Sequence, residues 1–151
     1  MKAAVFILAG EPSGDKLAAH IMRVINEHYK NIEWVGVGGS SMYEEGLDSF
    51  VDMEKLSVIG FGEALLAYRR LTLLANALVE HVISKKPKLI ITVDNKGFSV
   101  RFATLLKSRM KSIGWSVPIV HCVAPTVWAW GSWRAKKFAM AMDGLLCLFP
   151  F

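Results

Sequence analysis

The chain has 151 residues, of which 53% are apolar and 21% charged, and its mean hydropathy is +0.35. This length allows one α/β domain rather than two, and the composition excludes a disordered or low-complexity protein. The net charge of +5 is uneven, because residues 1–63 carry 5 Lys/Arg against 10 Asp/Glu and residues 64–151 carry 13 against 3. A basic later part suits an anionic partner, and an ordinary solvated surface explains it equally well.

The chain begins with an apolar run, residues 3–9, that leads into a Gly-Glu-Pro turn. Because no cleavage site follows the run, we expect a first strand and not a signal peptide. The only two cysteines, Cys122 and Cys147, lie inside apolar runs. We therefore expect buried free thiols in a reducing compartment and no disulfide framework.

Short apolar runs alternate with helical stretches along the chain. The runs are rich in β-branched residues, which is typical of strands buried on both faces of a parallel sheet. Strands are expected at residues 3–9, 32–37, 89–93, 119–123 and 145–149, and helices at residues 16–29, 63–84, 98–112 and 133–142. The alternation predicts an α/β fold, a doubly wound, mostly parallel sheet with helices on both faces. Ligands bind such sheets outside the carboxyl ends of the strands.

The first strand runs directly into a glycine-rich turn, residues 10–15, with the sequence GEPSGD. Its glycines allow a tight turn close to a ligand, Ser13 or Asp15 can cap the next helix, and the amides of a helix N-terminus favour an anion. The turn is neither a P-loop nor a dinucleotide fingerprint, and a plain strand-to-helix turn is an equal alternative. The second strand ends in a similar run, residues 36–42, which ordinary turn chemistry explains at least as well.

The strand at residues 89–93 is followed immediately by a carboxylate, Asp94. A carboxylate at the mouth of the sheet can act as a general base that takes a proton from a hydroxyl nucleophile. A structural aspartate that caps the following helix is the competing interpretation.

The fourth strand ends in an aromatic run, residues 121–130, with the sequence HCVAPTVWAW. Trp side chains offer flat surfaces on which a sugar ring or an acyl chain packs. A buried structural cluster is the alternative, and for His121 alone a core histidine is favoured. The basic residues Arg134, Lys136 and Lys137 follow, which suits phosphate binding and also a solvated helix face.

The apolar segment at residues 56–79 is interrupted by Glu63, Arg69 and Arg70, so it falls short of the ~20 apolar residues that a membrane span requires. On a helical wheel its polar residues form one stripe, and its leucines occupy more than one flank. One flank can cover the sheet while the other lies in a membrane interface, where the arginines meet lipid phosphates. Burial by a further domain or by a dimer is the alternative.

Together these motifs resemble lipid-A-disaccharide synthases, which are glycosyltransferases of the GT-B type. The resemblance covers essentially the whole chain, as a series of short matches in the same order. The matches are residues 7–15, residues 36–39 with Met42, Glu45 and Gly46, residues 52–54 and 58–60, Glu63 and Leu65, Asp94, residues 123–125 and 127–129, and residues 148–151.

The resemblance implies a hexosyl transfer in lipid A biosynthesis without a metal or cofactor. The 6-hydroxyl of 2,3-diacylglucosamine 1-phosphate attacks C1 of UDP-2,3-diacylglucosamine, and UDP leaves. Asp94 falls on the family's catalytic aspartate, most simply as base toward that hydroxyl. Substrate binding is expected at Gly10, Glu11, Ser13, Gly14, Asp15, Gly38, Gly39, His121, Pro125 and Trp128, and a membrane-facing surface at Leu65, Leu66, Arg69, Arg70 and Leu73.

The resemblance also implies an acceptor-side Rossmann-like domain at residues 1–151, with the UDP-sugar domain beyond them. We therefore expect the chain alone to be inactive, and to lie in the cytoplasm, peripheral on the inner face of the inner membrane. A nucleic-acid partner is not expected, and a homo-oligomer stays open. The family's Asp-x-Pro-Asp-Phe-Asn run reads DNKGFS at residues 94–99, so a second carboxylate and an amide are missing. A phosphate- or nucleotide-binding module and a membrane-docking scaffold without chemistry are the alternatives.

Overall fold

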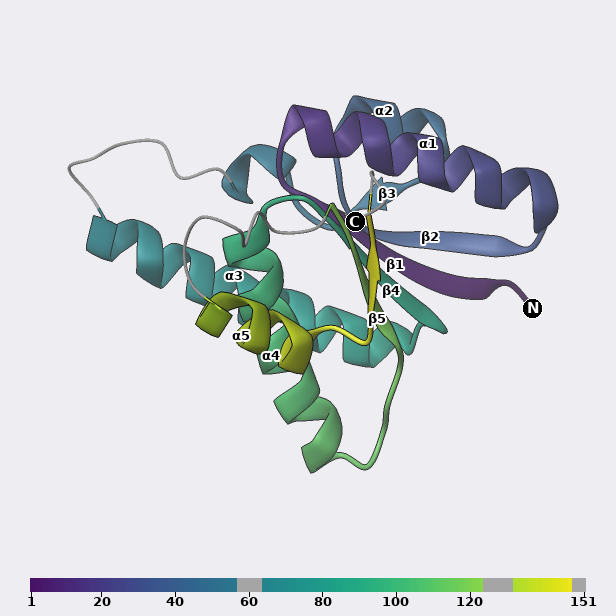
Figure 1. Ribbon diagram of the computed structural model, residues 1–151. Coiled ribbons are helices and arrows are strands. Elements are labelled where there is room, and N and C mark those ends of the chain that lie inside the picture. Colours follow the sequence, from purple (N-terminus) through teal and green to yellow (C-terminus); the bar gives the residue numbers. More distant parts are fainter. Residues whose placement is uncertain (57–63, 124–131, 148–151) are drawn as a thin grey trace.

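The computed structural model describes residues 1–56, 64–123 and 132–147 (Figure 1). Strands and helices alternate as the apolar runs predict. In chain order they are β1 (Ala3–Ala9), α1 (Pro12–His28), β2 (Ile32–Val37), α2 (Ser40–Glu44), β3 (Asp48–Ser49), the 3-10 helix η1 (Met53–Leu56), α3 (Ala64–Lys85), β4 (Leu89–Val93), α4 (Lys96–Ser112), β5 (Ile119–Cys122), α5 (Ser132–Ala141) and β6 (Gly144–Leu146).

The strands form one six-stranded sheet in the order β3-β2-β1-β4-β5-β6, and every pairing is parallel. The predicted α/β sheet is therefore confirmed. From β1 the chain moves outward to β3, crosses back to β4 and then moves outward on the other side. The order reverses between β1 and β4, so the connections after these two strands diverge and leave a crevice at their carboxyl ends.

Two hydrophobic layers enclose the sheet. Figure 1 shows α1 and α2 on one face and α3, α4 and α5 on the other. Because side chains alternate along a strand, Phe6 of β1 packs with the α3–α5 layer, where its ring stacks on Phe102 of α4 at 5.4 Å between centroids, and Ile7 packs with the α1 layer. Both faces of the central strands are buried, which explains their continuous apolar sequence.

Several element boundaries differ from those expected. Helix α1 begins at Pro12, four residues early, because proline supplies a helical φ at a position whose N–H needs no partner. Ser13 and Asp15 do not cap α1, since its N-cap residue is Glu11 and no side chain caps it. The short elements α2, β3 and η1 lie inside the glycine-rich stretch after β2 and were not predicted.

The C-terminal elements are shorter than predicted. Strand β5 ends at Cys122, and β6 covers three residues, while residues 148–149 of the last predicted strand lie outside the described residues. Both cysteines are free thiols, as expected. Cys122 is buried, and burial raises the pKa of its thiol, whereas Cys147 is exposed and the expectation of burial is wrong for it.

Strands β1 and β2 approach each other most closely at Gly36. This residue has a φ of +146°, and an added Cβ would collide with the carbonyl oxygen of its partner Ile7. Only glycine allows this approach, because it has no Cβ and tolerates positive φ.

Replacing Gly36 with alanine is expected to lower the free energy of unfolding by about 3 kcal/mol or more, because the collision and the backbone strain act together. The matched control is Gly114→Ala, since Gly114 also has positive φ but open space around an added Cβ. The control is expected to cost about 1 kcal/mol. Urea denaturation would measure both, and equal losses would show that the contact with β1 is unimportant.

Candidate functional site

The glycine-rich turn and Asp94 meet at the crevice between β1 and β4. An ideal Cβ on Gly14 would lie 3.6 Å from the Cβ of Asp94 and 3.4 Å from the carbonyl oxygen of Val93. The first turn of α1 therefore packs directly on the end of β4. The meeting of these two motifs at one edge of the sheet, which the sequence predicts, is confirmed.

The backbone holds Asp94 in an unusual conformation. Asp94 and Asn95 both have positive φ, +52° and +40°, a region that Asp and Asn tolerate better than most residues. The N–H of Asp94 donates to the carbonyl oxygen of Cys122 at 3.1 Å, and the hydroxyl of Ser99 donates to the carbonyl oxygen of Asp94 at 3.0 Å. Asn95 is the N-cap residue of α4 and no side chain caps that helix, so the interpretation of Asp94 as a helix cap is wrong.

Asn95, the residue after Asp94, lines a cavity of about 670 Å³, here called the switch-point cavity, which is large enough for a sugar with part of an apolar chain. Asp94 itself is not among its lining residues. One wall comes from the turn after β1, one from the start of α4, and one from η1 and α3. The lining residues are Glu11, Pro12, Ser13, Leu56, Leu71, Asn95, Gly97, Phe98 and Arg101. Two predicted substrate-binding residues, Glu11 and Ser13, are therefore in this cavity.

Gly10 is needed for packing at the same place. An added Cβ on this buried residue would collide with the side-chain nitrogen of Asn95. Gly10 thus lets the connections after β1 and β4 lie against each other, whereas an added Cβ on Gly14 would make ordinary contacts. Their direct contact with a substrate stays a prediction.

Asp15 lies on the α1 side of the sheet, where it holds the second glycine run. Its side chain is only 4% exposed, and its carboxylate accepts hydrogen bonds from the backbone N–H groups of Gly39, Ser41 and Met42 at 2.8, 3.0 and 3.2 Å. The carboxylate thus caps the N-terminus of α2, where negative charge is favourable. Asp15 and Gly39 do not line the switch-point cavity, and neither does Gly38, where an added Cβ would collide with Met42.

His121 is a core histidine between the sheet and α5. It is fully buried, its Nδ1 lies 2.7 Å from the hydroxyl of Thr92, and its ring packs edge-on against Phe138 at 4.8 Å. Burial lowers the pKa of His121 to about 4, although nearby Asp94 acts in the opposite direction. Its Nε2 has no hydrogen-bond partner among the residues that the structure describes. Pro125 and Trp128, the other predicted substrate-binding residues of the aromatic run at residues 121–130, lie outside the described residues.

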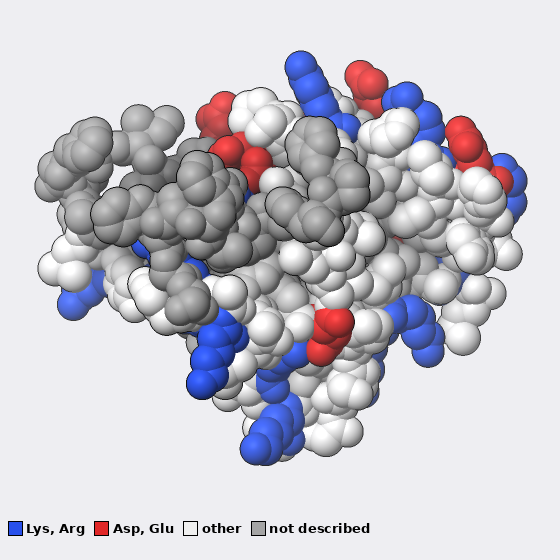
Figure 2. Space-filling model, in the orientation of Figure 1, with Lys and Arg blue, Asp and Glu red and all other residues white. Residues whose placement is uncertain are grey.

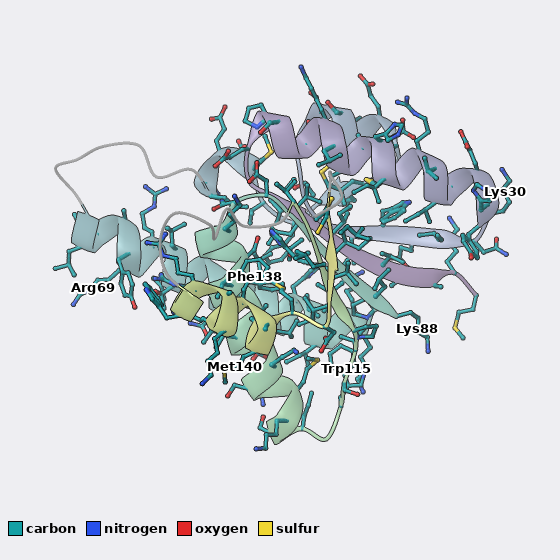
Figure 3. All side chains as sticks on the ribbon, in the orientation of Figure 1. Lys30, Arg69, Lys88, Trp115, Phe138 and Met140 are labelled. Carbon is teal, nitrogen blue, oxygen red and sulfur yellow. The ribbon has the colours of Figure 1, made fainter. Side chains whose placement is uncertain are left out.

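Helix α3 presents an exposed leucine flank. Leu65, Leu66 and Leu73 are 71%, 57% and 72% exposed, whereas Leu78 is buried against the sheet. Arg69 and Arg70 are exposed, and Figure 3 shows Arg69 pointing outward from this helix. One flank of α3 thus covers the sheet, as predicted, and the other faces outward. None of the helices described is long and apolar enough to cross a membrane.

The surface charge follows the two layers. In Figure 2 the acidic side chains of the visible face lie mostly over the layer of α1 and α2, and the layer of α3–α5 shows mainly Lys and Arg. This matches the difference between residues 1–63 and 64–151. In the described parts of the chain, no three His, Cys, Asp or Glu side chains gather as a metal site requires.

Arg101 of α4 is a site residue that the sequence interpretation missed. Its guanidinium lies over the ring of Tyr68, 4.1 Å from the centroid, and its Nη1 donates to the hydroxyl of Thr72 at 3.2 Å. The sequence does contain an indication of this residue, because Gly97 and Arg101 are four residues apart and lie on one face of the helix that follows β4. The basic residues that the sequence interpretation selects instead are Arg134, Lys136 and Lys137.

A model of the lipid-A-disaccharide synthetase family matches residues 5–151. The chain belongs to this family. It is 38% identical over 151 residues to the lipid-A-disaccharide synthase of Aromatoleum aromaticum, and the alignment covers all of this chain and 37% of that protein. It is 40% identical over 147 residues to the synthase of Ruegeria pomeroyi, with coverage of 97% and 35%. The chain thus spans about a third of the length of these curated relatives.

Against the family's Asp-x-Pro-Asp-Phe-Asn run, Gly97 and Ser99 are the positions that lack the second carboxylate and the amide. Gly97 lines the switch-point cavity, and an added Cβ would meet no atom within 4 Å. Ser99 is buried and bonds to the backbone of Asp94. In this member of the family, therefore, one position opens the cavity and the other supports Asp94.

The neutral state of His121 predicts how the stability of the protein falls in acid. Because the pKa of about 4 in the folded protein lies below the ordinary histidine pKa of 6.5, the unfolded chain takes up the proton first as the pH falls. The contribution is complete above about pH 6.5 and is lost between about pH 6.5 and 4, by about 3 kcal/mol. Urea unfolding at a series of pH values measures this loss.

Two variants separate His121 from other titrating groups. His121→Gln is expected to lose this part of the acid sensitivity even if it is less stable at neutral pH. His20→Gln, which removes an exposed histidine of α1, is expected to keep it. An unchanged acid response in His121→Gln would contradict the assignment.

Proposed function

We propose that residues 1–151 form the part of a lipid-A-disaccharide synthase that receives the acceptor sugar and supplies the catalytic base. The supporting observation is the position of Asp94, held by backbone hydrogen bonds next to Gly14 and directly before Asn95, which lines the switch-point cavity. The family match supports the reaction class. The proposed substrates are UDP-2,3-diacylglucosamine and 2,3-diacylglucosamine 1-phosphate.

In the proposed reaction, Asp94 accepts the proton of the acceptor's 6-hydroxyl while that oxygen forms a bond to C1 of the donor. The bond between C1 and the diphosphate oxygen breaks, and UDP leaves with the electron pair. One base is sufficient for this step, so the absence of a second carboxylate at Gly97 does not prevent it. We assign the contacts to UDP to the part of the relatives that this chain does not span.

Replacing Asp94 with asparagine is expected to lower kcat about 10²- to 10⁴-fold, with a small change in the KM for the acceptor. Asparagine also tolerates positive φ, so the fold is expected to persist. A suitable enzyme is a chimera in which this chain replaces the matching 37% of the Aromatoleum aromaticum relative. Disaccharide formation and UDP release measure the rate.

The matched control is Asp48→Asn, which removes an exposed carboxylate at β3 and is expected to leave the rate unchanged. Retention of activity in Asp94→Asn would remove Asp94 from the mechanism. If the chain alone bound UDP tightly, the alternative of a free-standing nucleotide-binding module would be favoured instead.

We also propose that the outward flank of α3 rests on the inner face of the cytoplasmic membrane, which would place the chain in the cytoplasm as a peripheral protein. The supporting observation is the exposure of Leu65, Leu66 and Leu73 together with Arg69 and Arg70. Leucines enter the acyl boundary and arginines meet anionic headgroups in such an arrangement.

Co-sedimentation with anionic vesicles tests this orientation. Binding is expected to weaken at high salt, and Leu65→Ser with Leu73→Ser is expected to reduce it about tenfold or more through lost apolar burial. The control is Tyr43→Ser, which removes an equally exposed apolar side chain from α2 on the opposite face and is expected to have little effect. Equal binding by both variants would contradict the proposed orientation.

A further inference from the structure

Arg101 is a cation in the wall of the switch-point cavity, and no described carboxylate pairs with it. The ion pairs among the described residues involve Arg23, Lys85, Lys107 and Arg109, and Arg101 takes part in none of them. It is half-buried, whereas most basic residues of α4 and α5 are exposed. A guanidinium in this position has lost part of its hydration, and the described part of the chain supplies no opposite charge in return.

Helix α3 holds this guanidinium in place. The ring of Tyr68 covers one face, and the hydroxyl of Thr72 accepts one hydrogen bond while donating its own to the carbonyl oxygen of Tyr68 at 2.9 Å. A guanidinium carries five N–H donors in its plane, and the described residues supply an acceptor to one of its nitrogens. The stacked face is thus used for orientation, and most in-plane donors remain for a ligand.

The surroundings of Arg101 define the ligand. Leu56, Leu71 and Phe98 line the same cavity, so the cation borders an apolar wall. Gly97, one helical turn before Arg101, leaves open space, and among the described residues of the lining the only carboxylate is that of the exposed Glu11, in the turn after β1. A ligand that matches these groups has an anionic head and an apolar tail.

We propose that Arg101 binds the phosphate monoester of the acylated acceptor sugar, with an acyl chain along Leu56, Leu71 and Phe98. This assignment rests on the proposed function, which names the acceptor. Arginine matches two phosphate oxygens with parallel N–H donors, and such charged hydrogen bonds are stronger than neutral ones. The phosphate is on C1 and the reacting hydroxyl is on C6 of one sugar, so a phosphate fixed at α4 orients the sugar relative to Asp94. Arg101 is thus a positioning and specificity residue.

The test compares two ligands that differ only in the phosphate. Calorimetry on the 151-residue chain would use a short-chain diacylglucosamine 1-phosphate, below its micelle concentration, and the same sugar without phosphate. The phosphorylated ligand is expected to bind about tenfold to a hundredfold more tightly. Arg101→Gln is expected to abolish this ratio, and Arg101→Lys to restore part of it because a point charge remains.

Two further variants provide an independent check and a matched control. Gly97→Asp adds a carboxylate four residues before Arg101, in open space and in the first turn of α4, where an acid is tolerated. It is expected to pair with Arg101 and to reduce the phosphate preference to a similar extent. Arg109→Gln removes an exposed arginine of the same helix, one that pairs with Glu80 at 2.9 Å, and is expected to keep the full preference.

Each outcome distinguishes this assignment from the proposed function. If Arg101→Gln keeps its thermal midpoint and the full phosphate preference, the assignment to Arg101 is wrong while the acceptor site stands. If Arg101→Gln loses affinity for UDP or inorganic phosphate instead, the residue serves a different anion and the assignment is also overturned. If the wild-type chain binds neither sugar, the acceptor site itself fails.

Discussion

The whole site depends on the close contact between the first turn of α1 and the end of β4. Gly14 lies next to the carbonyl oxygen of Val93 and the Cβ of Asp94, at distances where an added Cβ would make ordinary van der Waals contact. Gly10 permits a closer approach by Asn95. Gly10 therefore lets the two connections that diverge from the switch point of the sheet lie against each other, and the walls of the cavity follow from that contact.

The charged side chains near the switch point differ in how completely they are hydrogen-bonded by the protein. On the α1 side of the sheet, the carboxylate of Asp15 accepts hydrogen bonds from three backbone N–H groups of the glycine-rich run after β2, and these bonds fix α2. By contrast, the carboxylate of Asp94 and most guanidinium donors of Arg101 have no protein partner among the hydrogen bonds of the described residues. A buried charge that is fully hydrogen-bonded stabilises a loop, whereas an incompletely bonded charge beside a cavity is available to a ligand.

Much of this arrangement was predictable from the order of apolar runs. β1, β2 and β4 lie at the expected residues because strands buried on both faces have continuous apolar sequence. The elements α2 and β3 were missed, since their few residues carry no periodicity and their conformation depends on Asp15, which lies distant in the sequence. Because this long-range contact is not visible in the local sequence, the sequence indicates Asp15 only as a possible cap of its own helix. The spacing from Gly97 indicates Arg101, but its contacts with Tyr68 and Thr72 of another helix are not visible in the sequence.

The departures at Gly97 and Ser99 gain a physical meaning in the folded chain. A carboxylate at position 97 would share a helix face with Arg101 and compete for its donors, and glycine removes that competitor without a packing cost, since its surroundings are open. Ser99 is small enough to be buried while its hydroxyl reaches the backbone of Asp94. The changes thus act on different charges of one site: one leaves the cation of α4 without a carboxylate at position 97, and the other supports the left-handed backbone conformation of Asp94.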